Sequence, residues 1–112
     1  TKGMVGADAF RNVKENAVFI NLGRGPIVDE DAMIEALREG SLKGAALDVF
    51  TVEPLPVENE LWALDNVLIS PHNMDQTATF MHEATEFFVN EQLPRFIQGE
   101  KVLNEVSVTE GY

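Results

Sequence analysis

The sequence predicts an α/β fold: about three parallel strands with flanking helices and a long helix near the C-terminal end. Short apolar runs alternate with segments whose apolar residues recur at helical spacing. The runs are continuous rather than alternating, which is typical of parallel strands buried on both faces. A strand, helix, strand order favours parallel pairing through right-handed crossovers.

The first part of the chain supplies a helix, a strand and a well-capped second helix. Helical spacing predicts a helix over Gly6–Lys14, and an apolar run predicts a strand over Ala17–Leu22. The second helix is expected from Asp29, which is a good N-cap, to Glu39. Gly40 provides its C-terminal stop.

Two further strands follow. Gly44–Phe50 is predicted to be a buried strand, Asn59–Leu64 one helical turn, and Val67–Ser70 a third strand closed by Pro71. A sheet of three strands leaves at least one edge without hydrogen-bond partners. We therefore expect the sheet to continue in residues outside this chain.

From about Gln76 the pattern becomes helical. Its apolar residues follow the i, i+4, i+7, i+8 rule: Phe80, Ala84, Phe87 and Phe88. Pro94 is expected to end or kink this helix near Gln92. Residues 101–112 are expected to form an irregular tail. The chain is thus interpreted as two parts, residues 1–75 and 76–112.

Composition narrows the classes of partner. The 112 residues are 45% apolar and 24% charged, which is ordinary for a globular protein. A formal net charge of −11 argues against nucleic acid and against anionic membranes. No apolar run approaches the ~20 residues of a membrane span. The absence of cysteine leaves the compartment open, with a lean to the cytoplasm.

Polar residues follow the predicted strands at positions that suggest one site. Arg24, Asp48, Glu53 and His72 each come just after an apolar run. The carboxyl ends of parallel strands are where open α/β sheets hold ligands. Glycines flank Arg24, so its backbone could approach a ligand closely. Its guanidinium could bind a carboxylate through two parallel hydrogen bonds.

Each of these residues also has a plainer interpretation. Arg24 and Glu53 could be solvated loop residues, and Asp48 could cap a turn or a neighbouring helix. An isolated histidine is more often structural than catalytic, so His72 gains its interest from its position. His82, within the last predicted helix, is interpreted as a surface or packing residue.

Several chemistries lack their motifs. The sequence has no glycine-rich phosphate loop and no serine in a G-x-S-x-G elbow. The two histidines lack the spacing of metal ligands, so we expect no metal site.

Linked motifs carry a resemblance to a known family. They are N-L-G-R-G-P-I-V-D at 21–29, A-L-R-E-G at 36–40, G-A-A-L-D-V-F-T-V-E-P-L-P at 44–56 and N-V-L-I-S-P-H at 66–72. In this order they resemble the D-isomer-specific 2-hydroxyacid dehydrogenases, in the C-terminal half of their nucleotide-binding domain. The match runs from Thr1 to about Val106 and implies part of a Rossmann-type sheet.

The resemblance implies catalytic roles for three residues. His72 would give and take the proton on the substrate's carbonyl or hydroxyl oxygen. Glu53 would hold the imidazole and keep it protonated for reduction, and Arg24 would bind the substrate carboxylate. We therefore expect reduction of the 2-oxo acid to slow as rising pH removes the proton from His72.

The resemblance also implies a cofactor and partners. The cofactor would be NAD or NADP, with NAD favoured by the family, bordered by Leu22, Gly23, Arg24, Asp48 and His72. Asp48 would hold the nicotinamide carboxamide. The substrate would be a small 2-oxo or 2-hydroxy acid, and the full-length protein would be a homodimer. The P-H-N-x-D-x-T stretch at 71–77 is similar to that of glyoxylate/hydroxypyruvate reductase-like members.

Alternatives remain open at this level. We expect the chain to be a C-terminal fragment, inactive alone, because the G-x-G-x-x-G turn and the substrate domain would lie upstream. Residues 76–112 would then return to that missing domain. The family fold also serves as a nucleotide-sensing interaction module in corepressors that resemble these enzymes. A truncated product without a function of its own is the third alternative.

Overall fold

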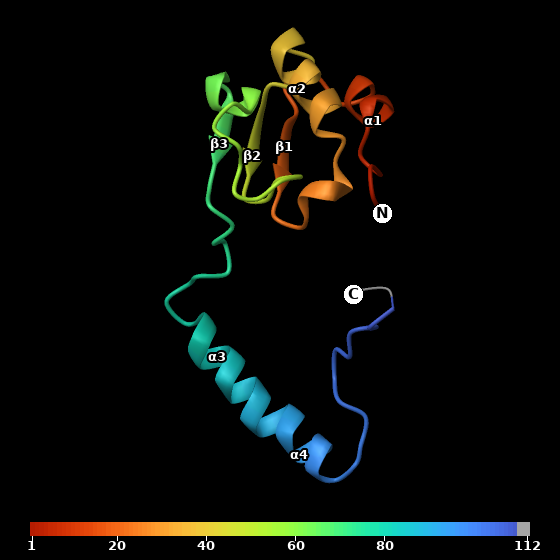
Figure 1. Ribbon diagram of the computed structural model, residues 1–112, viewed down its shortest axis with the longest axis vertical. Helices are drawn as coiled ribbons and strands as arrows, with labels where there is room; N and C mark the ends of the chain where they lie inside the picture. The colour runs from red at the N-terminus through yellow and green to blue at the C-terminus, as the bar shows by residue number, and fades with distance from the viewer. Residues whose placement is uncertain (110–112) are drawn as a thin grey trace. The chain divides into compact units, whose positions relative to one another are not determined.

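The computed structural model describes residues 1–109, which belong to two compact units divided after Met74. The first unit, at the N-terminal end of the ribbon in Figure 1, contains the sheet and its helices. Its elements are α1 (Ala7–Arg11), β1 (Val18–Asn21), η1 (Gly25–Ile27), α2 (Glu30–Glu39), β2 (Gly44–Leu47), η2 (Glu60–Ala63) and β3 (Val67–Ile69).

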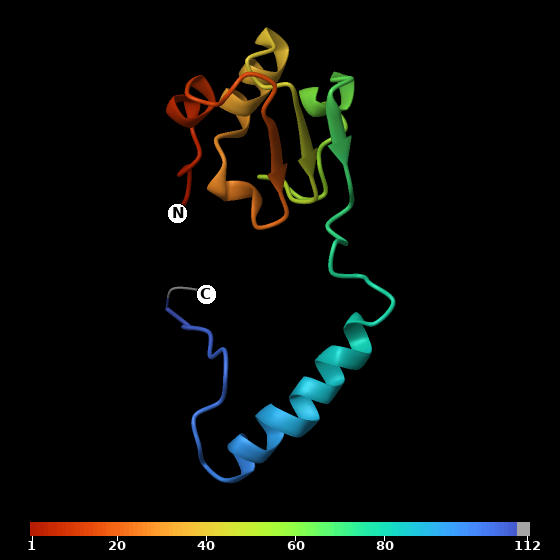
Figure 2. The ribbon, with the colours of Figure 1, turned by 180° about the vertical axis from the view of Figure 1, so that it is seen from behind.

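The three strands form one parallel sheet in the order β1-β2-β3, as predicted. Their common direction can be followed in Figure 2. Ile20 pairs with Ala46, and Ala46 pairs with Leu68, so these residues lie on one face of the sheet. Because the strands are parallel, their carboxyl ends all open toward one edge.

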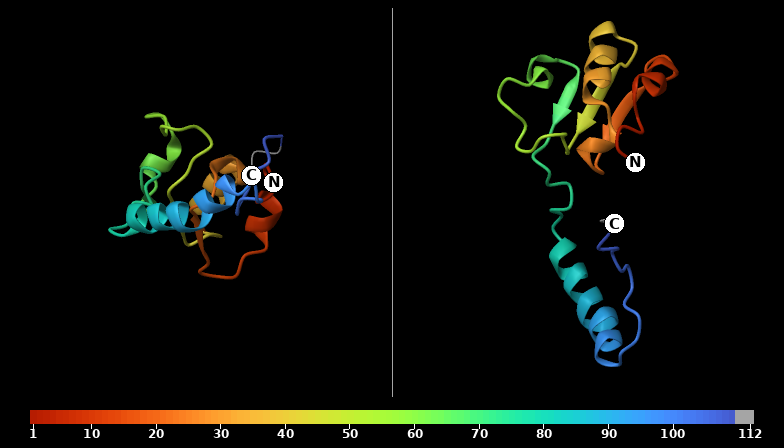
Figure 3. Two further views of the ribbon diagram at one scale, coloured as in Figure 1. Left: turned by 90° about the horizontal axis from the view of Figure 1, so that it is seen from below. Right: turned by 45° about the vertical axis from the view of Figure 1, so that its right-hand side comes forward.

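The hydrophobic core lies between the other face of the sheet and the helices α1 and α2. Phe19 and Leu47 of the sheet belong to it with Met33 and Leu37 of α2. Phe10 of α1 meets Phe19 edge to face, with ring centroids 5.5 Å apart. The right panel of Figure 3 shows α2 lying alongside the strands.

Within the first unit, β1 and β3 leave large apolar side chains uncovered on the opposite face of the sheet. Val18 is 56% exposed, Ile20 61% and Leu68 70%. The expectation that the strands are buried on both faces is therefore wrong for β1 and β3, whereas β2 is buried at Gly44, Ala45 and Leu47 and half-buried at Ala46. In the first unit, helices α1 and α2 both pack on one face of the sheet. Side chains alternate between the two faces along a strand, so every second side chain points away from these helices. The strands also end earlier than predicted, at Asn21, Leu47 and Ile69.

Helix α2 has the ends that the sequence predicted. Asp29 accepts a hydrogen bond from the backbone N–H of Ala32 at 3.2 Å. Gly40 adopts a left-handed conformation with φ of 76° at the other end. Helix α1 is shorter than predicted, because the chain leaves the helix at Asn12 rather than at Lys14.

The second unit is built on one continuous helical segment: α3 (Phe80–Phe87), the π-helical turn η3 (Phe88–Gln92) and α4 (Leu93–Ile97). Pro94 does not end the helix, so that part of the expectation is wrong. Proline cannot donate to the carbonyl four residues earlier, and its ring crowds that carbonyl. The wider π-helical turn directly before Leu93 makes room for it.

None of the helices within residues 1–109 is long and apolar enough to cross a membrane. The irregular tail predicted for residues 101–112 has no helix or strand as far as residue 109, and residues 110–112 lie outside the described residues.

Candidate active site

The predicted polar residues gather at the carboxyl ends of the strands in the first unit. Arg24 follows β1, Asp48 and Glu53 follow β2, and His72 follows β3. The parallel register brings these three loops to one edge of the sheet. This arrangement is the one that the order of the sequence motifs predicted.

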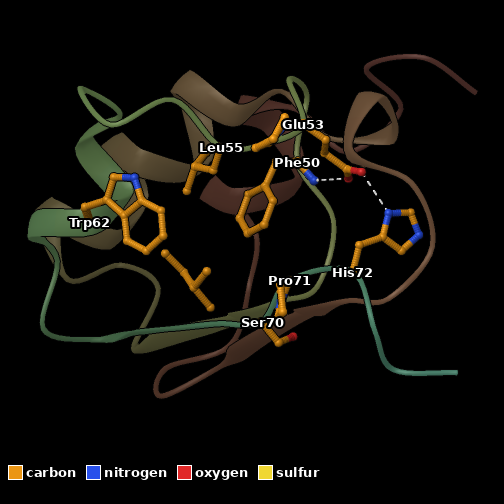
Figure 4. Close-up of a pocket in the computed structure, with 9 residues that line it drawn as sticks. Phe50, Glu53, Leu55, Trp62, Ser70, Pro71 and His72 are labelled. Atoms are coloured by element: carbon orange, nitrogen blue, oxygen red, sulfur yellow. Dashed lines mark hydrogen bonds and ion pairs between the residues drawn. The ribbon is translucent and has the colours of Figure 1, made fainter. Parts of the chain in front are cut away.

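Glu53 and His72 form a direct pair. Oε2 of Glu53 lies 2.8 Å from Nδ1 of His72, and Figure 4 shows the two side chains pointing toward each other. The other carboxylate oxygen, Oε1, accepts the backbone N–H of Phe50 at 2.9 Å. This second hydrogen bond fixes the carboxylate, and the carboxylate in turn fixes the imidazole. With Nδ1 engaged, Nε2 is the ring nitrogen that can exchange a proton with a ligand.

The electrostatics of the pair favour the ionised form of Glu53. The hydrogen bond from His72 is the largest influence lowering the pKa of Glu53, followed by the N–H of Phe50. The charges of His72 and Arg24 lower it further, and partial burial opposes them. Glu53 is therefore held in its ionised form, as an acceptor for the imidazole that it faces.

Asp48 is enclosed and accepts three hydrogen bonds from within the chain. Its side chain is 0% exposed. Oδ1 accepts the hydroxyl of Ser70 at 2.5 Å and the N–H of Asn73 at 3.0 Å, and Oδ2 accepts the N–H of Met74 at 3.0 Å. The Ser70 hydroxyl is the largest influence lowering the pKa of Asp48; burial opposes it, and the two backbone N–H groups and the charge of His72 add to the lowering. Asp48 therefore caps the turn that carries His72.

Arg24 is exposed on the loop between β1 and η1. The side chain of buried Asn21 shapes this loop: it accepts the N–H of Gly23 at 3.1 Å and donates to the carbonyl of Arg24 at 3.3 Å. The guanidinium donates through Nη1 to the carbonyl of Gly23 at 2.8 Å. Arg24 thus lies at the same edge as the Glu53–His72 pair without a hydrogen bond to it.

Gly25 is needed for a contact inside the chain rather than for a ligand. A Cβ atom there would lie 1.9 Å from the carbonyl carbon and oxygen of Phe50. The loop after β1 is therefore pressed directly against the backbone that follows β2. At Gly23 a Cβ would meet only ordinary contacts, the nearest at 3.6 Å. Of the glycines flanking Arg24, only Gly23 remains open for a ligand to approach.

The strand ends also fit one end of a dinucleotide. Leu22 is 46% exposed at the end of β1, and Gly23 beside it is exposed. A flat nicotinamide ring requires an apolar surface and nearby backbone polar groups, and these two residues offer both. The fit concerns that end alone, since the chain has no phosphate-binding glycine motif.

An apolar pocket of about 630 Å³ adjoins the pair. Its lining is mostly aromatic and aliphatic: Phe50, Glu53, Pro54, Leu55, Trp62, Ile69, Ser70, Pro71 and His72. Figure 4 shows Phe50, Leu55 and Trp62 on one side of the view and the pair at the edge. Glu53 and His72 themselves remain exposed beside this apolar wall, with side chains 36% and 43% accessible.

Sequence reasoning missed three polar residues that support the site. Ser70 was counted only as the end of a strand, although the Leu47–Ile69 pairing leaves it beside Asp48. Asn21 interrupts the apolar run of residues 17–22, and such an interruption is the signal for a buried side chain that shapes a turn. Glu30 accepts hydrogen bonds from Asn59 and from the N–H of Thr51, tying the loop after β2 to α2.

His82 lies outside this constellation. It is on α3 in the second unit, its side chain is 76% exposed, and its Nε2 lies 3.5 Å from Glu86. The interpretation of His82 as a surface residue is confirmed.

Comparison with known families decides the affiliation. Residues 1–73 match the model of the D-isomer specific 2-hydroxyacid dehydrogenase, NAD binding domain. The chain belongs to this family. The resemblance inferred from the motifs is thereby confirmed, together with the Rossmann-type sheet, and the family description itself names NAD binding.

Relatives within the D-2-hydroxyacid dehydrogenase family are close in sequence and structure. A glyoxylate/hydroxypyruvate reductase B from Escherichia fergusonii is 51% identical over 72 residues, covering 64% of this chain and 22% of the relative. The structure of a D-isomer specific 2-hydroxyacid dehydrogenase from Xanthobacter autotrophicus, in complex with NADPH and MES, has a TM-score of 0.85 at 45% identity. It is matched over all of this chain and 45% of its own.

A third relative is an NADPH-dependent glyoxylate/hydroxypyruvate reductase from Sinorhizobium meliloti, in complex with NADP and sulfate. It has a TM-score of 0.81 at 36% identity, over all of this chain and 36% of its own. The chain therefore spans less than half the length of each of these relatives.

Proposed function

We propose that this chain is the catalytic part of an NAD(P)-dependent D-2-hydroxyacid dehydrogenase, which interconverts a 2-oxo acid and a D-2-hydroxy acid. The observation that carries the proposal is the 2.8 Å contact between Glu53 and His72 at the carboxyl edge of a parallel sheet. A carboxylate–imidazole pair supplies the proton that carbonyl reduction requires. The family affiliation supports the same reaction.

His72 acts as the proton donor in reduction and as the acceptor in oxidation. Its Nδ1 is held by Glu53, which leaves Nε2 to transfer the proton to the substrate oxygen. Glu53 stabilises the charged ring before transfer and orients it throughout. The Phe50 N–H holds Glu53, so the pair keeps its geometry without a ligand.

Arg24 binds the carboxylate of the substrate. Its Nη1 is used by the carbonyl of Gly23, and the remaining donors of the guanidinium suit a carboxylate. The exposure of Arg24 makes it accessible to an anion. The lowering of the pKa of Glu53 by the charge of Arg24 indicates that both face the same region.

When bound, NAD or NADP supplies or accepts the hydride. We propose that Leu22 and Gly23 hold its nicotinamide end, with Arg24 and His72 bordering it. We propose that Asp48 holds the carboxamide of the nicotinamide, through the acceptor capacity that its three hydrogen bonds to Ser70, Asn73 and Met74 leave.

The proposed substrates are glyoxylate or hydroxypyruvate, because the relatives from E. fergusonii and S. meliloti are named for them. We further propose that the full-length protein is a cytoplasmic homodimer, which size-exclusion chromatography and cell fractionation would test. The substrate domain would come from outside this chain, so the 112 residues alone should show no turnover.

The test uses the full-length protein with NADH or NADPH and glyoxylate, hydroxypyruvate or pyruvate. His72→Ala and Arg24→Ala should each lower kcat/KM by at least ~100-fold, as expected for loss of a general acid or of a substrate clamp. His82→Ala and Arg11→Ala are matched controls on exposed helices and should leave turnover unchanged.

Near-normal turnover in both His72→Ala and Arg24→Ala would overturn the catalytic assignment. No turnover of any 2-oxo acid by the wild-type protein, together with tight cofactor binding, would instead support the nucleotide-sensing interaction module.

A further inference from the structure

We propose that Glu30 is a positioning residue that holds Glu53 in place against His72 from the first turn of α2. The observation is that one side chain ties both ends of the loop that carries Glu53. Oε2 of Glu30 accepts the backbone N–H of Thr51 at 3.2 Å, and Oε1 accepts the side-chain amide of Asn59 at 2.8 Å. This inference rests on the proposed function for its catalytic consequence.

The loop that carries Glu53 depends on ties of this kind. Residues 48–59 form neither helix nor strand, and residues 51–54 are exposed. Exposed loops move more than the elements that they connect. A catalytic side chain needs a fixed position, which its supporting hydrogen bonds must provide. Glu30 provides them from the first residue of α2, a helix whose start is capped by Asp29.

The peptide group between Phe50 and Thr51 links Glu30 to the Glu53–His72 pair. On one side this peptide packs against Gly25, where a Cβ atom would lie 2.5 Å from the nitrogen of Thr51. On the other side its N–H is bound by Glu30. Losing that bond allows the backbone of Phe50 to turn, and the N–H of Phe50 is the donor that fixes Oε1 of Glu53.

The far end of the loop is held to the same carboxylate through Asn59. The side-chain oxygen of Asn59 accepts the N–H of Leu61 at 2.9 Å and so caps η2, while its amide donates to Glu30. Leu61 is 1% exposed in the core, so this end of the loop is anchored there as well. Glu53 therefore lies between two points that Glu30 joins to α2.

The expected consequence is a less precise contact between Glu53 and His72. A misplacement of about 1 Å can cost ~100-fold in rate. Glu30 acts on Glu53 through the loop rather than by direct contact, so we expect a smaller loss of ~10-fold. Binding of the substrate carboxylate should change little, because Arg24 stands on the loop after β1.

The test compares Glu30→Ala, Glu30→Gln and Asn59→Asp in the full-length protein. Glu30→Ala removes both acceptor oxygens, whereas Glu30→Gln keeps one of them. Asn59→Asp keeps the oxygen that caps η2 but places a second carboxylate opposite Glu30. Asp31→Ala is the matched control, since it also removes an acidic side chain from the first turn of α2.

The first readout is the ¹⁵N spectrum of the histidine side chains, recorded without substrate. The His72 signals are assigned by their absence from His72→Ala, and those of His82 serve as an internal reference. Glu30→Ala and Asn59→Asp should shift the Nδ1 signal of His72, and Glu30→Gln should shift it less. Asp31→Ala should leave it unchanged. This readout does not need turnover, so it stands apart from any failure of the proposed reaction.

The second readout is kinetic. Glu30→Ala and Asn59→Asp should lower kcat by ~10-fold and Glu30→Gln by less, with KM for the 2-oxo acid within about twofold of wild type. A folded Glu30→Ala variant with unchanged His72 signals and unchanged kcat would overturn the proposal, because Glu30 would then only stabilise the fold. If Glu30→Ala does not fold, unchanged His72 signals in Asn59→Asp overturn it in the same way.

Discussion

At the residue scale, the candidate site depends on backbone contacts as much as on its titratable side chains. Glu53 is held by the N–H of Phe50, and Arg24 stands on a loop shaped by the side chain of Asn21. The same Phe50 backbone is the surface against which Gly25 packs. The loops after β1 and β2 therefore pack directly against each other, and there is no space for a side chain at Gly25, where they touch.

This contact gives a prediction at Gly25. Overpacking typically costs about 1–3 kcal/mol. Gly25→Ala should reduce the free energy of unfolding by about 3 kcal/mol or more, because its methyl group meets rigid backbone. Gly23→Ala is the adjacent control and should change it by less than about 0.5 kcal/mol, since its new methyl group meets ordinary contacts. Chemical unfolding of the purified proteins measures both. Equal stabilities of the two variants would contradict the packing at Gly25.

At the element scale, the elements and their order could be predicted from the sequence, whereas several boundaries and one burial pattern could not. The parallel order follows from apolar runs alternating with helical patterns, and the ends of α2 follow from Asp29 and Gly40. The end of a strand is set by its last hydrogen bond to a neighbouring strand. The sequence of one strand does not show which residues of its neighbours will form these bonds. For this reason β2 stops at Leu47 although the apolar run continues to Phe50.

The four polar residues of the candidate site could be proposed from the sequence, but the residues that hold them in place could not. Spacing and motif order pointed to Glu53 and His72, and their contact depends only on parallel strand ends meeting at one edge. The partners of Asp48 depend on register between β2 and β3, which a motif does not encode. Likewise, a continuous apolar run does not reveal which of its residues face a helix and which are bare, as at Ile20.

The cap of α2 gives a prediction at this scale. Asp29→Ala should reduce the free energy of unfolding by about 1 kcal/mol, because the N–H of Ala32 loses its acceptor at the helix start. Asp29→Asn keeps an acceptor oxygen and should restore most of that loss. Thermal and chemical unfolding of the pair measure the difference. An Asp29→Asn variant as unstable as Asp29→Ala would show that the cap contributes through its charge alone.

At the scale of the whole molecule, the chain carries 19 acidic residues against 8 lysines and arginines, so its behaviour in acid depends on which carboxylates are bound in the fold. Asp48 and Glu53 both have a lowered pKa and both join segments that follow different strands. Their ionised forms therefore stabilise the folded chain. A group of this kind contributes fully above its unfolded pKa, and the contribution is lost as pH falls through the folded pKa.

Ser70→Ala tests this linkage because the Ser70 hydroxyl is the largest influence lowering the pKa of Asp48. The variant should be less stable than wild type near neutral pH. The gap should narrow as pH falls below the ordinary Asp value of 3.8, because the wild type loses the stabilisation that the hydroxyl gives to ionised Asp48, a stabilisation that the variant never had.

Ser41→Ala is the matched control for that experiment. Its hydroxyl donates to the carbonyl of Ala36 at 3.1 Å, an acceptor that does not titrate. Losing this bond should lower stability by the same amount at every pH, so the gap from wild type stays constant. Chemical unfolding at a series of pH values between about 3 and 7 separates the two behaviours. A constant gap for Ser70→Ala would mean that Asp48 carries no acid-sensitive stability. A closing gap would show that Asp48 is ionised in the folded protein and that its hydrogen bond from Ser70 stabilises the fold.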